Sequence, residues 1–476
     1  SWEHYYRGIR KCNMLITRID NVPQPADLAD EEFERRKTNY LSSSRFLRAY
    51  FYWELFLRYG PVPIVTEVLD PDGDLLSDYT ERPSIEEFVV DFIMKELEEC
   101  EEGLLDYATG WNSTYAGQIS QPMASALYSR IALYMASPRY SAESGITWQD
   151  AADAAERFID TYGANFELMK TGTRPEERYT NMWLLNAYQE ANKEVIFYRN
   201  DVKINWCGIS MDTPVGEGGS GGLCPSQNLV DMYDMLDGSA PFAQYDATGA
   251  PVYTNGTPAI NAASGYTDAD MWTNRDPRLA ATVLTHGTEW GNGVIDVVWG
   301  GRDNPIGNAN STPTGYYVRK YIPENILSNT HSGSSYRLWT FIRYAEILLN
   351  YAEALNELGD PDDLVPGLLD QIRHRAGITG NVADRTDLAT TEAMRNFIRK
   401  ERTVELAYEE HRWWDVRRWG VAVEALSRPI YGVNVSADGT IARKKVQDRV
   451  FKEHMYLYPI PEAEVWKTDI ENNPGW

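Results

Sequence analysis

Apolar residues recur with helical spacing in several segments of the chain. They lie three and four positions apart, with polar residues on the opposite face, as in amphipathic helices. The predicted helices are residues 44–59, 84–105, 123–136, 148–162, 344–358, 364–376 and 391–419. Ser84, Glu86 and Glu87 are typical of a helix N-terminus. Because these helices recur as consecutive pairs, with small residues such as Ala126, Ala132, Ala152 and Ala155 where neighbours would approach closely, the pattern predicts a mainly α fold of irregular tetratricopeptide-like helix pairs.

The segment 200–335 lacks this periodicity. It is rich in Gly, Pro, Asn, Ser and Thr, with short β-like pieces such as residues 293–299. A long irregular insertion is usually functional, so we expect the recognition surface there. No long Ser/Pro/Gly linker divides the chain, which favours a single domain over residues 1–476. Within it we expect a helical scaffold (1–199), an irregular ligand-binding region (200–335) and a C-terminal helical scaffold (336–476).

Residues 391–420 are predicted to form one long amphipathic helix that ends at Gly420. Its apolar stripe contains Ile398, Val404, Leu406, Ala407, Trp413 and Trp414. Its charged face contains Glu401, Arg402, Glu405, Glu409, Arg412, Asp415, Arg417 and Arg418. Charges three and four positions apart favour a structural lattice of ion pairs around buried tryptophans over catalytic acids and bases.

The same segment, IRKERTVELAYEEHRWWDVRRWG, closely resembles the C-terminal signature of the SusD/RagB family, which are nutrient-binding outer-membrane lipoproteins of certain Gram-negative bacteria. Six further blocks resemble those of the family and occur in its order. They are YRGIRKCNML (6–15), SQNLVDMYDMLDG (226–238), RDPRL (275–279), GYYVRKY (315–321), RYAEILLNYAEALNELG (343–359) and YLYPIPEAEVWKTDIENNPGW (456–476). The resemblance covers most of the chain and implies a SusD-like scaffold of helix pairs.

The resemblance also implies a function. Members capture an oligosaccharide or polysaccharide at the cell surface and deliver it to a SusC-type TonB-dependent transporter, without catalysis and without a cofactor. They are held on the outer membrane by an N-terminal lipid. The family's lipid-bearing cysteine lies well upstream of residues 6–15, and Cys12 inside that block is no substitute. We therefore expect the anchor and the first part of the mature protein to be missing from this chain.

Three alternatives stay open at this point. One is a peptide-binding member like RagB, and another is a protein-interaction scaffold of repeats without a small ligand. The third is a polysaccharide hydrolase, which needs two carboxylates about 5–9 Å apart across a cleft. The six histidines form no H-E-x-x-H motif or other close pair, so a zinc hydrolase is unsupported.

Charge narrows the classes of partner. The chain has 70 acidic and 45 basic residues, a net charge of −25. Such a field repels nucleic acid and anionic lipid headgroups but is compatible with a neutral ligand. No run of 18 apolar residues occurs, so no segment is predicted to span a bilayer. Tyr (30) and Trp (15) together far outnumber Phe (13). This is a bias towards aromatic rings that also carry a polar group, which suit wet binding clefts.

The aromatic residues of the irregular region are the candidate ligand contacts. They are Trp206, Tyr253, Tyr266, Trp272, Trp290 and Trp299. One face of a pyranose ring stacks on an aromatic ring, while its hydroxyls need Asn, Asp, Arg or main-chain partners. Residues 290–304 supply both kinds of group, and Trp290 and Trp299 stand beside glycines that leave ring faces accessible. We expect these two to form an exposed platform, the alternative being rings that pin loops to the scaffold, above all at Trp272.

Three other motifs are weaker. Acidic residues occupy positions 1, 3, 5, 9 and 12 of a calcium-loop register, but a leucine replaces the required glycine, so a solvated acidic turn is favoured over a metal site. These residues are Asp70, Asp72, Asp74, Asp78 and Glu81. GEGGSGG (216–222) matches nucleotide-loop and nucleophile patterns without their strand and helix context, and is predicted to be a flexible loop. Cys207 and Cys224 flank it, and a disulfide and two free thiols both remain open.

Overall fold

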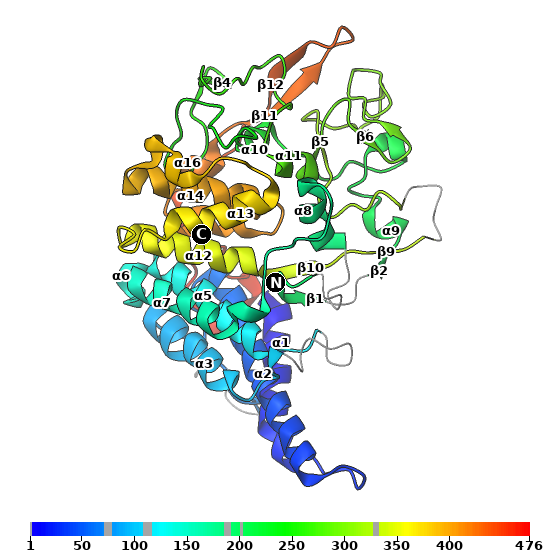
Figure 1. Cartoon of the computed structure of the whole chain (residues 1–476). Coiled ribbons are helices and arrows are strands. Elements are labelled where there is room, and N and C mark those ends of the chain that lie inside the picture. The colour runs from blue at the N-terminus through cyan, green and yellow to red at the C-terminus, as the bar shows by residue number, and fades with distance from the viewer. Residues whose placement is uncertain (1, 71–78, 108–116, 185–191, 200–202, 327–332) are drawn as a thin grey trace. The chain divides into compact units, whose positions relative to one another are not determined.

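The computed structural model describes residues 2–70, 79–107, 117–184, 192–199, 203–326 and 333–476 (Figure 1). Its contacts divide the chain into two compact units. Unit 1 comprises residues 1–164, 417–423 and 451–476, and unit 2 comprises residues 165–416 and 424–450. The division differs from the three segments expected from the sequence, because residues on both sides of position 335 belong to unit 2. The expectation of a mainly α-helical fold is confirmed.

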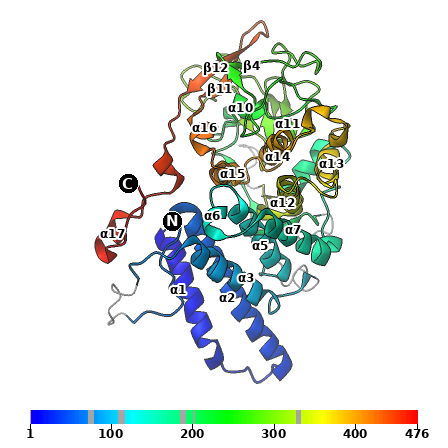
Figure 2. The same cartoon turned by 90° about the vertical axis from the view of Figure 1, so that its left-hand side faces the viewer.

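Unit 1 is built from helix pairs. Its helices are α1 (Trp2–Arg18), α2 (Asp30–Tyr59), the π-helix η2 (Glu86–Met94), α3 (Lys95–Glu101), α5 (Gln121–Ala136), α6 (Ser141–Ser144), α7 (Trp148–Tyr162) and α17 (Glu462–Thr468). Helix α1 packs on α2, and α5 packs on α7; Figure 2 shows the first pair side by side. Buried alanines such as Ala126, Ala132, Ala152 and Ala155 allow the close approach of α5 and α7. Ser84 caps η2 as predicted, since its hydroxyl accepts a hydrogen bond from Glu87 N (3.1 Å).

Unit 2 contains further helix pairs and most of the loops. Its helices are α8 (Pro175–Leu184), α9 (Trp206–Ile209), α10 (Gln227–Val230), α11 (Pro277–Thr282), α12 (Tyr344–Glu357), α13 (Val365–Ala376) and α14 (Thr391–Glu405). Helices α15 (His411–Arg418) and α16 (Ala422–Ser427) contribute residues to both units. The predicted pair of helices 344–358 and 364–376 is confirmed as α12 and α13, which pack on each other.

Within the described residues, the strands form two-stranded antiparallel sheets. The pairs are β1 (Val195–Arg199) with β10 (Trp339–Arg343), β2 (Lys203–Ile204) with β9 (Ser335–Tyr336), β3 (Tyr253–Thr254) with β4 (Thr257–Pro258), β5 (Val283–Leu284) with β8 (Tyr317–Val318), β6 (Glu289–Trp290) with β7 (Gly293–Val294), and β11 (Ile430–Val435) with β12 (Ile441–Gln447). Single turns of 3₁₀-helix complete the list at η1 (Ile19–Asn21), η3 (Gly163–Asn165), η4 (Val215–Glu217), η5 (Val382–Asp384), η6 (Thr386–Leu388) and η7 (Glu453–Tyr456).

The prediction of a single helix over residues 391–419 is wrong. Helix α14 ends at Glu405 and α15 begins at His411, and the residues between include Tyr408 (φ 64°) and Glu410 (φ 66°) in left-handed conformations. Side chains from elsewhere in unit 2 take the carbonyls that a continuing helix would use. Arg343 Nη2 donates to the carbonyl of Glu405 (2.7 Å), and Lys320 Nζ donates to that of Ala407 (2.6 Å).

The burial of this segment also departs from the usual amphipathic arrangement, because charged side chains are buried together with most of the apolar stripe. The side chains of Glu401, Arg402 and Glu405 are almost completely buried, whereas Trp413 keeps 39% of its surface exposed. The predicted ion-pair lattice is therefore present, but it forms the interior, and the expectation that Trp413 is buried within it is wrong.

A connected network of buried ion pairs forms the centre of unit 2. Among the described residues, its cations are Arg278, Lys320, Arg343, Arg373, Arg375 and Lys400, and its anions are Glu194, Asp234, Asp276, Glu401, Glu405 and Glu409. Every one of these side chains is at most 3% exposed. The charges balance, so the network adds no net charge to the interior.

Glu405 is the carboxylate with the most ion-pair partners in the network. It pairs with Arg278 (2.8 Å), Arg343 (2.6 Å) and Arg375. Glu194 precedes β1 and links Arg343 (2.7 Å) to Arg375 (2.6 Å), a position fixed by the pairing of β1 with β10. Buried ions are tolerated only when partners and hydrogen bonds replace the lost water, and here each carboxylate is contacted by more than one donor.

The sequence blocks quoted above supply most of this network. One acidic residue comes from block 226–238, two charges come from block 275–279, and one cation each comes from blocks 315–321 and 343–359. The C-terminal signature, 398–420, adds Lys400 and three glutamates. The blocks that carry the family resemblance are therefore mainly the parts of an ionic core.

Removal of one central charge should destabilise unit 2. We expect Glu405→Ala to lower the free energy of unfolding by about 3–5 kcal/mol, because Arg278, Arg343 and Arg375 would be left buried with one carboxylate fewer. Asp448→Ala is the matched control, since Asp448 is 69% exposed and pairs with Lys445 at the surface; its loss should cost less than about 1 kcal/mol. Urea unfolding of both variants measures the difference. Equal stabilities would contradict a structural role of the network.

The network should also make the protein acid-labile. Burial opposes ionisation of Glu405, but Arg375, Arg343 and Arg278 outweigh it and lower the pKa of its carboxyl. The pKa of Asp234 is likewise lowered, since Lys400 and Arg373 outweigh the effect of burial. The pKa of an Asp or Glu carboxyl in the unfolded chain is about 3.9–4.3. A carboxyl whose pKa is lower than this in the folded protein stabilises the fold above that pH, and the stabilisation is lost as the pH falls.

We therefore expect the free energy of unfolding to decline steadily below about pH 4.5. The decline should be shallower in Glu405→Gln, which has no carboxyl to protonate at this position. Urea titrations at steps between pH 6 and pH 3 test this, and an identical slope in the variant would contradict the assignment.

Candidate functional site

A cavity beside Trp299 is the first candidate site in unit 2. It has a volume of about 770 Å³. Its lining comes from residues 297–313 and from the β11–β12 hairpin, namely Val297, Val298, Trp299, Asn304, Asn308, Ser311, Thr312, Pro313, Asn434, Val435, Ser436, Ala437 and Lys444. Trp299 is 70% exposed, which is unusual for the largest apolar side chain.

Main-chain hydrogen bonds hold the loop that carries Trp299. Asp303 N donates to Asp296 O (2.9 Å), and Gly300 N donates to Asn304 O (2.9 Å). The Asp303 carboxylate is buried and accepts from Asp296 N (2.9 Å) and from Gly216 N (3.1 Å). Burial raises the pKa of Asp303. The loop is therefore closed on itself, and Trp299 lies at a fixed tip with its ring in solvent.

The polar groups around Trp299 are mostly uncharged. Asn308, Asn434 and Ser436 are exposed, and their amides and hydroxyl can both donate and accept hydrogen bonds. Lys444 is the cation of the lining, and burial lowers the pKa of its ammonium. An exposed ring beside such groups is suited to a ligand with one apolar face and many hydroxyls.

The expected exposed platform of Trp290 and Trp299 does not form, because Trp290 is only 2% exposed. It packs in an apolar cluster with Ile209, Ile295 and Tyr317. The β6–β7 hairpin turns its ring inward, and the hairpin is tied down where Asn292 N and Nδ2 each donate to the Glu217 carboxylate (2.8 Å). Glu217 also pairs with Arg302.

The other predicted aromatic contacts lie apart from the Trp299 cavity. Trp206 and Tyr266 are buried, so the expectation of accessible rings is wrong for them. Trp272 is half-buried and donates from Nε1 to Tyr316 Oη (3.1 Å), as expected of a ring that pins a loop. Tyr253 is half-buried and stacks on Tyr431 at 5.0 Å with an interplanar angle of 3°. Ligand contact by Tyr253 and Trp272 stays a prediction.

Sequence reasoning missed the contribution of the β11–β12 hairpin, residues 430–447, to the cavity. We expected the whole recognition surface within residues 200–335, but Asn434, Ser436 and Lys444 also line it. The Asp-Gly pair at 438–439 between two β-branched runs is a hairpin signal that would have found this element.

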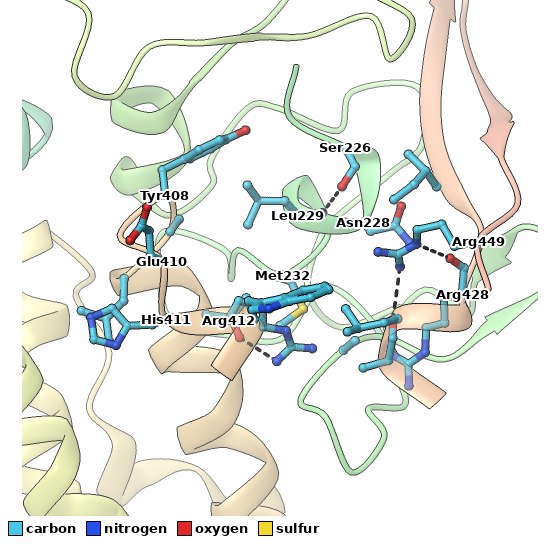
Figure 3. Close-up of a pocket in the computed structure, with 18 of the residues that line it drawn as sticks. Ser226, Asn228, Leu229, Met232, Tyr408, Glu410, His411, Arg412, Arg428 and Arg449 are labelled. Carbon is cyan, nitrogen blue, oxygen red and sulfur yellow. Dashed lines mark hydrogen bonds between the residues drawn. The ribbon is translucent and has the colours of Figure 1, made fainter. Parts of the chain in front are cut away.

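A second cavity, of about 370 Å³, lies at the break between α14 and α15 (Figure 3). Its apolar lining includes Leu229, Met232, Leu406, Leu426 and Ile430, and its rings are Tyr253, Tyr408 and Trp413. Its charged lining consists of Glu410, His411, Arg412, Arg428 and Arg449. Burial lowers the pKa of Arg412 to about 10. None of these residues was singled out as a ligand contact from the sequence except Tyr253.

The weaker motifs have different outcomes. Three of the five calcium-loop candidates, Asp72, Asp74 and Asp78, lie outside the described residues, and Asp70 and Glu81 are exposed. Within the described ranges, no group of three or more His, Cys, Asp or Glu side chains is arranged to hold a metal ion. Cys207 and Cys224 are both free thiols.

The glycine-rich loop 216–222 is closely packed, in contrast to the flexible loop expected. Ser220 N donates to Ser210 O (2.9 Å), and Gly221 N donates to Thr213 O (3.0 Å). A side chain at Gly219 would collide with the main chain of Thr213. The glycines are therefore required by packing.

Comparison with known proteins identifies the family. Residues 167–476 match the model of the SusD family, and residues 1–133 match a model described as starch-binding associating with outer membrane. Because the first match covers more than half of the chain, the chain belongs to the SusD family. Of the helices described by the structure, none has the length and hydrophobicity needed to cross a membrane.

Individual relatives match nearly the whole chain. SusD-like protein P38 of Formosa agariphila is 24% identical over 449 residues, which cover 91% of this chain and 74% of the relative. The crystal structure of a SusD-like protein from Bacteroides fragilis has a TM-score of 0.79 and 28% identity, and covers 100% of this chain and 85% of that one. A structure named as a laminarin-binding SusD-like protein has a TM-score of 0.57 and 23% identity, with coverage of 100% and 85%.

The two tryptophans of residues 290–304 should respond oppositely to truncation. Trp290→Ala should lower the free energy of unfolding by about 3–5 kcal/mol, because a large ring is removed from a packed cluster. Trp299→Ala should change it by less than about 0.5 kcal/mol, because the ring is in solvent. Thermal or urea unfolding measures both. A large loss in Trp299→Ala would show that its ring is part of the core.

Proposed function

We propose that this protein is a glycan-binding protein of the cell surface, and that the cavity beside Trp299 is its binding site. The observation that carries the proposal is the 70% exposed indole on a loop fixed by its own hydrogen bonds, next to side chains that bind hydroxyl groups. The polarised C–H face of a sugar ring stacks on the indole. Its hydroxyls exchange water for the amides of Asn308 and Asn434 and the hydroxyl of Ser436.

The charge of the whole chain argues against a polyanionic ligand. The whole chain carries −25, which repels polyanions. Among the described residues that line the cavity, none is Asp or Glu. Since cleavage of a glycosidic bond by the usual route needs a pair of carboxylates flanking it, we propose capture without hydrolysis.

The names of relatives agree with this proposal. One structural relative, from Bacteroides fragilis, is called a SusD-like carbohydrate binding protein; it has a TM-score of 0.73, 24% identity, and coverage of 97% of this chain and 83% of that one. The laminarin-binding relative and the starch-binding family description name the same class of ligand. On this basis we propose that the protein is lipid-anchored in the outer membrane and delivers oligosaccharide to a SusC-type TonB-dependent transporter.

A paired binding experiment tests the site. A glycan array selects an oligosaccharide, and calorimetry measures its dissociation constant for the parent protein and for Trp299→Ala. We expect a loss of about 2 kcal/mol, on the order of thirtyfold, because truncation of a central aromatic contact has this effect. Trp466→Ala is the matched control, since Trp466 is 75% exposed in unit 1 and lies outside the cavity.

Each alternative has its own readout. Unchanged affinity in Trp299→Ala places the glycan elsewhere. Release of shorter sugars during prolonged incubation contradicts capture without hydrolysis. Retention of peptides but of no glycan replaces the proposal with a peptide-binding function.

A further inference from the structure

The pocket at the α14–α15 break has a lining unlike that of the Trp299 cavity. The two share no lining residue. Here the walls are apolar side chains from α10, α16, β11 and the segment between α14 and α15, together with three aromatic rings. Its volume, about 370 Å³, lies in the range of small-molecule sites, which are about 300–1,000 Å³. A flat apolar group is the kind of ligand body that such walls accept.

Arginines give one side of this pocket a positive charge. Figure 3 shows Arg428 and Arg449 on one side of the pocket, and it shows Tyr408, Glu410 and His411 on the opposite side. Arg428 is neutralised by Asp246 (2.7 Å) and Glu424 (2.6 Å). Arg449 is different, because its hydrogen bonds go to uncharged main-chain oxygens.

The guanidinium of Arg449 is held in place but not neutralised. Nε donates to Arg428 O (2.8 Å) and Nη2 donates to Ala425 O (3.2 Å). Among the ion pairs of the described residues, none includes Arg449. Burial and the nearby charge of Arg428 lower its pKa, so the cation is disfavoured where it stands. Two of its five N–H groups are used, which leaves both N–H groups of Nη1 and one of Nη2 for an anion.

We propose that this pocket binds a small organic carboxylate on a flat apolar body, with its ring between the apolar walls and its carboxylate on Arg449. A carboxylate matches the guanidinium fork and compensates its charge. A sugar would place hydroxyls against Leu229, Met232 and Ile430 without partners, and a neutral apolar molecule would leave Arg449 uncompensated. Glu410 lies on the side opposite Arg449. Its negative charge repels a carboxylate, so the ligand is oriented with its carboxylate toward Arg449. The site is additional to the proposed glycan function and does not depend on it.

Cinnamate and its neutral amide, cinnamamide, test the proposal directly. Ligand-observed NMR titration of the intact chain should show saturable cinnamate binding about tenfold or more tighter than that of cinnamamide, because a hydrogen-bonded ion pair is lost in the amide. Absence of saturable cinnamate binding, or equal affinity for acid and amide, overturns the assignment.

Variants locate the site. Arg449→Gln should weaken cinnamate about tenfold and leave cinnamamide unchanged, whereas Trp413→Ala should weaken both, because it removes a wall. Lys445→Gln is the control, since it removes one positive charge from the same unit at a side chain that is 54% exposed and outside the pocket. Unchanged cinnamate affinity in Arg449→Gln overturns the role of Arg449.

Two measurements keep the test separate from folding and from glycan binding. Unfolding curves establish that each variant is folded, and Arg449→Lys, which keeps the charge, should retain a preference for the acid if Arg449→Gln is unstable. Trp299→Ala should bind cinnamate like the parent protein. Loss of cinnamate binding in that variant would place the carboxylate in the other cavity and overturn the proposal.

Discussion

Unit 2 depends on a balance of buried charge. Its interior holds a connected set of arginines, lysines and carboxylates that water does not reach. These buried ions stabilise the fold only as a complete set, because removal of one leaves its partners buried without an opposite charge. The pairing of β1 with β10 places Glu194 beside Arg343. Ion pairs positioned in this way offset the free-energy cost of removing the charges from water. Segments that are far apart in sequence must therefore fold together.

This constraint also explains where the two cavities described above arise. The side chains of Arg343 and Lys320 bind the carbonyls of Glu405 and Ala407, where α14 ends, and the resulting break forms one wall of the pocket at α15. The Trp299 loop lies outside the network and is held by its own main-chain bonds and by the bonds of Asp303 and Arg302 to Gly216. Rigidity thus comes from two independent sources, an ionic core and a locally closed loop, and each supports a different cavity.

Periodicity predicted helices that pack as neighbouring pairs, such as α12 and α13, and the quoted blocks predicted the family. It failed at residues 406–410 because the 3.6-residue pattern continues through them, and only donors from distant segments break the helix. It failed at Trp290 because the direction of that ring is set by a hairpin anchored on Glu217. The Trp299 cavity needed tertiary pairing as well, since Asn434 and Lys444 reach it from a hairpin more than 100 residues away in the sequence.

For the proposed glycan site, the loop that carries Trp299 has a consequence for how ligand preference can change. Residues 296–304 close on themselves through hydrogen bonds from Asp303 and Gly300 to main-chain oxygens, bonds that do not depend on the identity of the side chain at the tip. The tip can therefore be exchanged as a module, by grafting another loop of equal length between the same anchor points. A new specificity can arise there without any compensating change in the ionic core.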